Sequence, residues 1–241
     1  MKPSSDDSPN TSKLISKPSR TFTIRELEPL AEKLLRDTFP FGKGIPIDID
    51  FIAESHLGLE IFPIPGLEAN YIPGLEANYN AFGALRKLGN DLYDIVVDKD
   101  ILDYNINLYR FTLGEEIAHY VLHKEHFRCV VTAEQACALQ RELAADMHHM
   151  ERNAKWLSSA LLMPSEDVKR EANMVYGEIV KNVGFSNYDA IIGKLTDMLA
   201  NPFRVSRSAM QYRLGNYPCK VTEAVQKSVR AHHADLWKIE T

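Results

Sequence analysis

The first regular alternation of apolar and polar positions in the chain follows Thr23. Thr23 and Glu26 have the spacing of a capping box, the signature of a helix N-terminus. Apolar residues then recur every three or four positions: Leu27, Leu30, Ala31, Leu34 and Leu35. This period predicts an amphipathic helix, in which Pro29 is a candidate kink. A second, short helix is predicted from Asp48, its N-cap, to Gly58, its natural stop.

The pattern changes between residues 59 and 98. Three short segments rich in β-branched and aromatic residues, separated by Gly, Pro and Asn, predict strands at 59–64, 81–86 and 93–98. We expect them to form a small antiparallel sheet. Beyond Asn107 the helical period returns and predicts helices near 108–124, 133–162, 166–182, 188–200, 206–215 and 221–238. The predicted fold class is therefore α+β, mainly helical with one small sheet.

A tandem duplication interrupts the strand region. The segment Ile64–Tyr71 recurs unchanged as Ile72–Tyr79. Solenoid repeats have longer units and need at least three copies, so a solenoid is excluded. We interpret the duplication as a lengthened loop; the alternative is a loop that reshapes a cleft beside the sheet. Residues 1–20 are rich in Ser, Pro, Asp and Lys, and we expect a disordered tail there.

Composition narrows the function classes. The formal net charge is −5, which disfavours nucleic-acid binding by the chain as a whole. Residues 188–215 superficially resemble a helix-turn-helix, with Ser206 as an N-cap and Arg204, Arg207 and Arg213 nearby, and DNA binding there is the minor alternative. The N-terminus has no apolar signal-peptide region, no segment is apolar enough to span a membrane, and the three cysteines form no Cys-x-x-Cys pair. We expect a soluble, cytoplasmic protein.

The candidate chemistry lies on the predicted helix 108–124. Residues four apart share a helix face, so Glu115, His119 and His123 form one row, with Glu116 beside it. A zinc peptidase helix of type H-E-x-x-H has this geometry, with two His ligands and a Glu that acts as general base. Glu116 matches the base and His119 the second ligand. Glu115 stands at the first ligand position, where a carboxylate oxygen can also bind zinc. The alternative reading is an ordinary solvated helix face.

Two further histidines are candidates for the same site. His148 lies on the next long helix and is a candidate replacement for the missing His ligand; the alternative is a solvated face. His123 is either a second-shell partner of His119 or a histidine at the negative end of the helix dipole.

Three segments in order resemble the ImmA/IrrE family of metallopeptidases. Residues 110–123 resemble its R-F-T-L-A-H-E-L-G-H-Y-L-L-H segment, residues 151–164 resemble E-x-x-A-N-x-F-A-x-x-L-L-M-P, and residues 203–214 resemble F-x-V-S-x-x-A-x-x-x-R-L. The resemblance implies a zincin-like fold with the sheet beside the active-site helix and a domain covering residues 21–215. Residues 216–241 would be a helical extension.

The resemblance also implies a site and a partner. Glu151 corresponds to the family's third metal ligand, which completes the set Glu115, His119 and Glu151 with Glu116 as base. The implied cofactor is Zn²⁺; two carboxylates and one imidazole are a harder donor set, so Mn²⁺ or Fe²⁺ could compete. The implied substrate is a regulatory protein such as a helix-turn-helix repressor in stress or mobile-element regulation, and an edge strand within 81–86 could pair with it.

Two departures from the family pattern give an alternative function. Glu115 replaces a His, and Lys155 replaces an Asn one turn after Glu151, where its cation could compete with a metal. The alternative is therefore a pseudo-peptidase that binds a protein partner without cleaving it.

Overall fold

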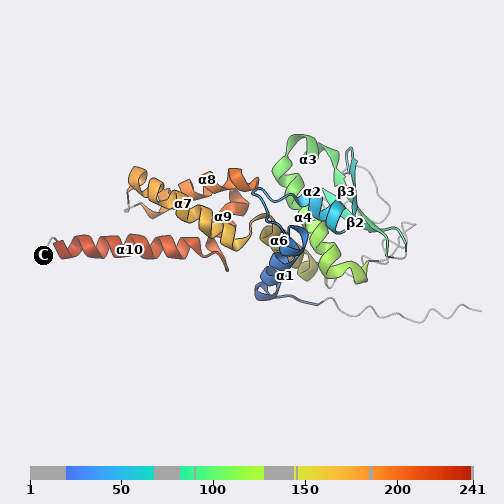
Figure 1. Cartoon of the computed structure of the whole chain (residues 1–241), viewed down its shortest axis with the longest axis horizontal. Helices are drawn as coiled ribbons and strands as arrows, with labels where there is room; N and C mark the ends of the chain where they lie inside the picture. Colours follow the sequence, from blue (N-terminus) through green and yellow to red (C-terminus); the bar gives the residue numbers. More distant parts are fainter. Residues whose placement is uncertain are drawn as a thin grey trace, which may run out of the picture.

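The computed structural model describes residues 20–67, 82–89, 91–127, 144, 146–184 and 187–239. Most of the expected tail (1–19), most of the duplication (68–81) and the first part of the helix expected at 133–162 lie outside these residues. The elements form two groups along the longest axis of the molecule: the sheet with α1 to α6, and the helices α7 to α10 (Figure 1).

Helix α1 (Ile24–Thr38) confirms the first predicted helix and its cap. The Thr23 N–H donates to the Glu26 carboxylate at 2.8 Å, as the capping box requires. Pro29 lies inside the helix without ending it. The predicted apolar stripe is buried at four of its five positions: Leu27, Ala31, Leu34 and Leu35.

The second predicted helix is confirmed in an unusual form. The Asp48 side chain accepts the Phe51 N–H at 3.0 Å and caps α2 (Ile49–Phe51), which continues as a π-helical turn over Ile52–His56. Gly58 has φ +69°, a conformation that glycine adopts readily, and ends the element as predicted.

The three predicted strands are present, but their pairing is mixed. The sheet order is β1-β3-β2, with β1 (Glu60–Ile64) parallel to β3 (Tyr93–Asp98) and β2 (Gly83–Lys87) antiparallel to it. The expectation of an all-antiparallel sheet was therefore wrong. All six residues of β3 are buried. Buried strands take the central position, and the long connection from β1 to β2 lets β1 add on the far side of β3 in the parallel sense.

Helix α4 (Ile106–His123) crosses this sheet. Asn105 caps it by accepting the Leu108 N–H at 3.2 Å, and a 3₁₀ turn (Lys124–His126) follows it. A short helix that sequence reasoning missed, α3 (Lys99–Tyr104), precedes it; the Asp98 side chain caps α3 by accepting the Asp100 N–H at 2.7 Å.

Helix α6 (Met147–Leu162) packs on both α4 and α1 and forms the middle of the hydrophobic core. Helices α7 (Ser165–Val183), α8 (Tyr188–Phe203), α9 (Arg207–Gly215) and α10 (Val221–Ile239) follow it and pack on one another. None of the helices in the described ranges is long and apolar enough to cross a membrane.

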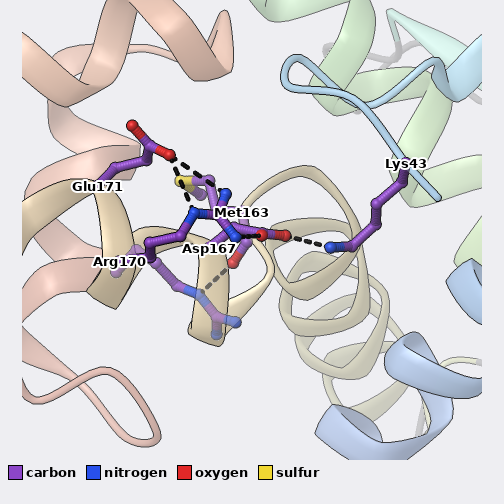
Figure 2. A network of polar contacts seen from close by, with 6 residues as sticks. Lys43, Met163, Asp167, Arg170 and Glu171 are labelled. Atoms are coloured by element: carbon purple, nitrogen blue, oxygen red, sulfur yellow. Dashed lines mark hydrogen bonds and ion pairs between the residues drawn. The ribbon is translucent and has the colours of Figure 1, made fainter.

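Two ionic contacts join distant parts of the chain. Arg213 of α9 is 2% exposed; it forms a bidentate ion pair with Glu28 of α1 and donates to the Met163 carbonyl at 2.9 Å. Figure 2 shows the second contact, in which Asp167 of α7 accepts from Lys43 of the α1–α2 connection and from Arg170 of its own helix. The removal of one partner from the buried Glu28–Arg213 pair would leave an uncompensated buried charge. The ion pair therefore fixes α1 against α9 in addition to the packing of apolar side chains.

The α4–α6 contact leaves no room for a larger residue at position 114. A Cβ on Gly114 would lie 2.4 Å from the Ser158 Oγ. We predict that Gly114→Ala lowers the free energy of unfolding by about 1–3 kcal/mol, the usual cost of overpacking. Urea denaturation measures this change.

A control and a rescue accompany that measurement. Gly177 lies on an exposed face of α7 with nothing near its would-be Cβ, so Gly177→Ala should raise the free energy of unfolding by up to about 1 kcal/mol. Adding Ser158→Gly to Gly114→Ala should recover part of the loss. Equal effects of the two alanines would show that the helices do not approach as closely as described.

Candidate functional site

Two side chains from different helices meet where α4 packs on α6. His119 of α4 and Glu151 of α6 lie with Nε2 and Oε1 3.5 Å apart. The close approach of Gly114 to Ser158 holds the two helices together one turn earlier on α4, and the Ser158 hydroxyl donates to the Phe111 carbonyl at 3.0 Å. Two of the three predicted metal ligands are therefore in contact.

The other face of the His119 ring is enclosed by its own helix end. Its Nδ1 lies 3.2 Å from Nδ1 of His123, and the edge of its ring packs on Phe127 with centroids 6.1 Å apart. Both histidines are buried, at 7% and 1% exposure. Both alternatives predicted for His123 agree with its position. It is the last residue of α4, at the negative end of the helix dipole, and it also contacts the candidate ligand His119.

The charges around His119 are mutually stabilising. Burial by itself would lower the pKa of His119, but the contact with Glu151 and the neighbouring Glu116 and Glu115 carboxylates raise it overall. The hydrogen bond with His119 in turn lowers the pKa of Glu151. Burial and the neighbouring His119 lower the pKa of His123 to about 3, so His123 is neutral at physiological pH.

Glu115 and Glu116 are in the opposite situation. Burial raises the pKa of each carboxyl to about 7, and repulsion from Glu116 adds to the rise at Glu115. Oε1 of Glu115 is buried and has no hydrogen-bond partner among the residues that the structure describes. A carboxyl group with a pKa near neutrality is suited to exchange protons at physiological pH.

Glu116 is tied to the open edge of the sheet. The Asp98 N–H donates to the Phe82 carbonyl at 2.7 Å, which makes Phe82 and Asp98 a hydrogen-bonded pair. Because such pairs alternate along an antiparallel ladder, the backbone groups of Gly83 and Leu85 point away from β3. The Leu85 N–H donates to the Glu116 carboxylate, which lowers its pKa and partly offsets burial. Sequence reasoning missed this contact, because no local signal relates a helix residue to one strand N–H.

The helix also approaches this strand closely. A Cβ on Gly83 would lie 2.5 Å from the Thr112 Cγ2 and 3.4 Å from the Glu116 Cγ. Gly83 therefore allows β2 to lie directly against α4 beside Glu116.

The donor set fits a divalent transition-metal ion in chemistry and in part in position. Two donors of one tetrahedral zinc, each at about 2.0–2.1 Å, are about 3.4 Å apart. The 3.5 Å between His119 Nε2 and Glu151 Oε1 matches this spacing. The unpartnered Glu115 oxygen is a buried acceptor that a cation would satisfy. However, within the described ranges no three His, Cys, Asp or Glu side chains are grouped as a metal centre, so Glu115 does not join the other two.

The structure shows His148 in contact with its neighbour on α6 and exposed to solvent. Its ring packs against His149 with centroids 5.9 Å apart. Lys155 is also exposed on α6, but its charge acts on both Glu115 and Glu151 and opposes the burial effect at each.

Residues 107–215 match the model of a peptidase family, described as the IrrE N-terminal-like domain. This segment runs from α4 through α9, is a little under half of the chain, and contains Glu115, Glu116, His119 and Glu151. Residues 107–215 belong to the IrrE N-terminal-like family. The resemblance to ImmA/IrrE metallopeptidases is thereby confirmed, and the matched segment is metallopeptidase-like. A comparison with curated proteins gave no match.

In the IrrE N-terminal-like segment, the burial of Glu115 should make the stability of the fold depend on pH. Because burial raises the pKa of this carboxyl from 4.5 to about 7, folding favours its protonated form. Its contribution to stability is complete below the unfolded pKa and is lost as pH rises through the folded pKa. We predict that Glu115→Gln melts above the wild-type protein at pH 8 by a few °C, since about 1 kcal/mol shifts Tm by roughly 2–4 °C in a protein of this size.

The comparison is made on metal-free protein in chelator. The advantage of Glu115→Gln should shrink towards pH 5, where both side chains are uncharged. Asp189→Asn, at the exposed start of α8, is the control and should show no such trend. A difference that is constant with pH would mean that the Glu115 carboxyl is not strained by its surroundings.

Proposed function

We propose that this protein is a metal-dependent endopeptidase that acts on another protein. The observation that carries the proposal is the His119–Glu151 contact across α4 and α6, at the spacing of two donors of one ion. His119 and Glu151 would hold the metal. We propose Glu115 as the third ligand, which requires its side chain to turn towards the other two when the metal binds. We propose Zn²⁺ as the ion; with two carboxylates in the donor set, Mn²⁺ or Fe²⁺ would bind in competition.

In the proposed reaction, the metal and Glu116 have separate roles. A divalent ion held by His119 and Glu151 would supply a more acidic water and a polarised scissile carbonyl. The Glu116 carboxylate takes the proton of the attacking water and returns it to the leaving amine. The pKa of Glu116, raised by burial to about 7, suits both steps near neutral pH. The Leu85 N–H keeps this carboxylate beside the sheet edge.

The same edge is a suitable seat for an extended substrate. Among the described residues β2 has no neighbouring strand on its outer side, where the backbone groups of Gly83 and the carbonyl of Leu85 point; the Leu85 N–H already donates to Glu116. Strand addition supplies main-chain hydrogen bonds to such an edge. The other edge, β1, contains Pro63, which lacks an N–H and makes that strand a poorer partner. We therefore propose that the substrate is an extended segment of a protein. From the family resemblance we further propose that this protein is a helix-turn-helix repressor in the cytoplasm.

The metal part of the proposal is tested by elemental analysis of purified protein. The wild-type chain should carry a single metal ion, and His119→Ala and Glu151→Ala should lose it. His148→Ala is the matched control on α6 and should keep it, because that side chain is exposed and packs against His149. Wild-type protein that takes up no Zn²⁺, Mn²⁺ or Fe²⁺ would contradict the proposal.

The catalytic part is tested with a helix-turn-helix repressor as substrate. Glu116→Gln should retain the metal and reduce cleavage by about 10²–10⁴-fold, the usual contribution of a general base. Cleavage is followed by mass spectrometry of the products. A Glu116→Gln variant that cuts as fast as the wild type would remove Glu116 from the mechanism.

One observation favours a second candidate function, a pseudo-peptidase. Among the described residues, Oε1 of Glu115 is buried without a partner, and Glu115 does not complete a group of three ligands with His119 and Glu151. The charge of Lys155 also acts on both carboxylates, as a metal would. In this case the wild-type chain would bind a repressor without cutting it, and Glu115→His would restore metal uptake.

A further inference from the structure

The hydrogen bond between His119 and His123 has a direction that metal binding would fix. The two Nδ1 atoms are 3.2 Å apart, so one must carry the proton and the other must accept it. His119 has only one other ring nitrogen, Nε2, and this atom faces Glu151. A nitrogen that binds a metal presents its lone pair and carries no proton. A neutral His119 that binds through Nε2 therefore carries its proton on Nδ1.

We propose that His123 is the positioning residue of the metal-loaded site: when a metal replaces the proton on His119 Nε2, the Nδ1 of His123 accepts the Nδ1–H of His119 and thereby holds the His119 ring with the Nε2 lone pair towards the metal beside Glu151. This inference rests on the proposed function and adds a residue to it. Metal-ligating histidines usually donate their second N–H to such an outer partner, commonly a carboxylate, a carbonyl or water. Here the buried partner is a second imidazole from the same helix, one turn later.

The surroundings of His123 support this role. The ring is 1% exposed, and within the described part of the chain its second nitrogen, Nε2, is buried without a hydrogen-bond partner. With Nδ1 as acceptor, Nε2 of the neutral ring carries a proton that no group accepts. A buried, unpartnered N–H is unfavourable for the fold. An apolar side chain would fill this position at lower cost, so the stability of the fold gives no reason for a histidine here.

The position of the rings leaves few other ways to hold His119. The His119 and His123 rings are tilted by 51° with centroids 5.3 Å apart, and Phe127, an apolar ring, packs against His119 in a T-shaped arrangement. Packing on Phe127 restricts rotation of the imidazole but does not distinguish its two tautomers. The hydrogen bond with His123 does distinguish them.

The test compares zinc affinity with stability in two variants of His123. His123→Leu keeps an apolar side chain of similar bulk and removes the acceptor. We expect zinc affinity, measured by competition with a chromophoric chelator, to fall by about 10–100-fold. The melting temperature of the metal-free protein should stay the same or rise, because the unpartnered nitrogen is gone. His123→Asn places an amide oxygen near the position of Nδ1 and should recover most of the affinity.

The control is His56→Leu, which removes an exposed histidine from the π-helical turn and should leave zinc affinity unchanged. In zinc-loaded wild-type protein, ¹⁵N-edited NMR should also show a protonated Nδ1 on His119. Unchanged zinc affinity in His123→Leu would overturn the inference and leave the proposed function intact. A loss of affinity that follows a loss of melting temperature, without rescue by Asn, would reduce His123 to a structural residue. Wild-type protein that takes up no Zn²⁺, Mn²⁺ or Fe²⁺ would overturn the proposed function, and the inference with it.

Discussion

The close packing of α4 on α6 is the constraint on which the rest of the site depends. No hydrophobic contact by itself would place a histidine of one helix against a carboxylate of the other. The absence of a side chain at Gly114 lets the α4 backbone approach Ser158, and the Ser158 hydroxyl is satisfied by a carbonyl of α4. At this separation the side chains of His119 and Glu151 reach each other across the interface. A wider separation would leave two solvated side chains on two unrelated helices.

A second contact relates the same helix to the sheet. Gly83 allows β2 to lie against α4, and the Leu85 N–H reaches the Glu116 carboxylate. The successive residues Glu115 and Glu116 therefore face different partners, one towards the α6 charges and the other towards the edge strand. Both are buried enough to raise their pKa values to about 7. The fold thus keeps two carboxyls close to their ionisation point near an imidazole that contacts Glu151, an arrangement suited to proton transfer and to cation binding.

Much of this arrangement could be predicted from the sequence where the signal is local. The capping box of Thr23, the Asp48 cap and the helical row containing His119 depend on neighbours within a few residues, and the structure has all three. The strands were also found. Their pairing was not, because the central position of β3 depends on what covers its two faces and on how a long connection returns. The short helix α3 was missed because its six residues contain too few apolar positions to show a period.

The candidate site also contains residues that the sequence could predict and contacts that it could not. Residue types and a family resemblance named His119, Glu116 and Glu151, but no sequence pattern could show that Glu115 has a buried, unpartnered oxygen or that Leu85 donates to Glu116. These features depend on the three-dimensional meeting of segments distant in the chain. The central claim, that His119 and Glu151 together hold a metal ion, is tested most directly by crystals of zinc-loaded protein and anomalous diffraction at the zinc edge. The account predicts one strong peak in contact with His119 Nε2 and the Glu151 carboxylate. A peak confined to the exposed His148–His149 pair, or no peak at all, would contradict it.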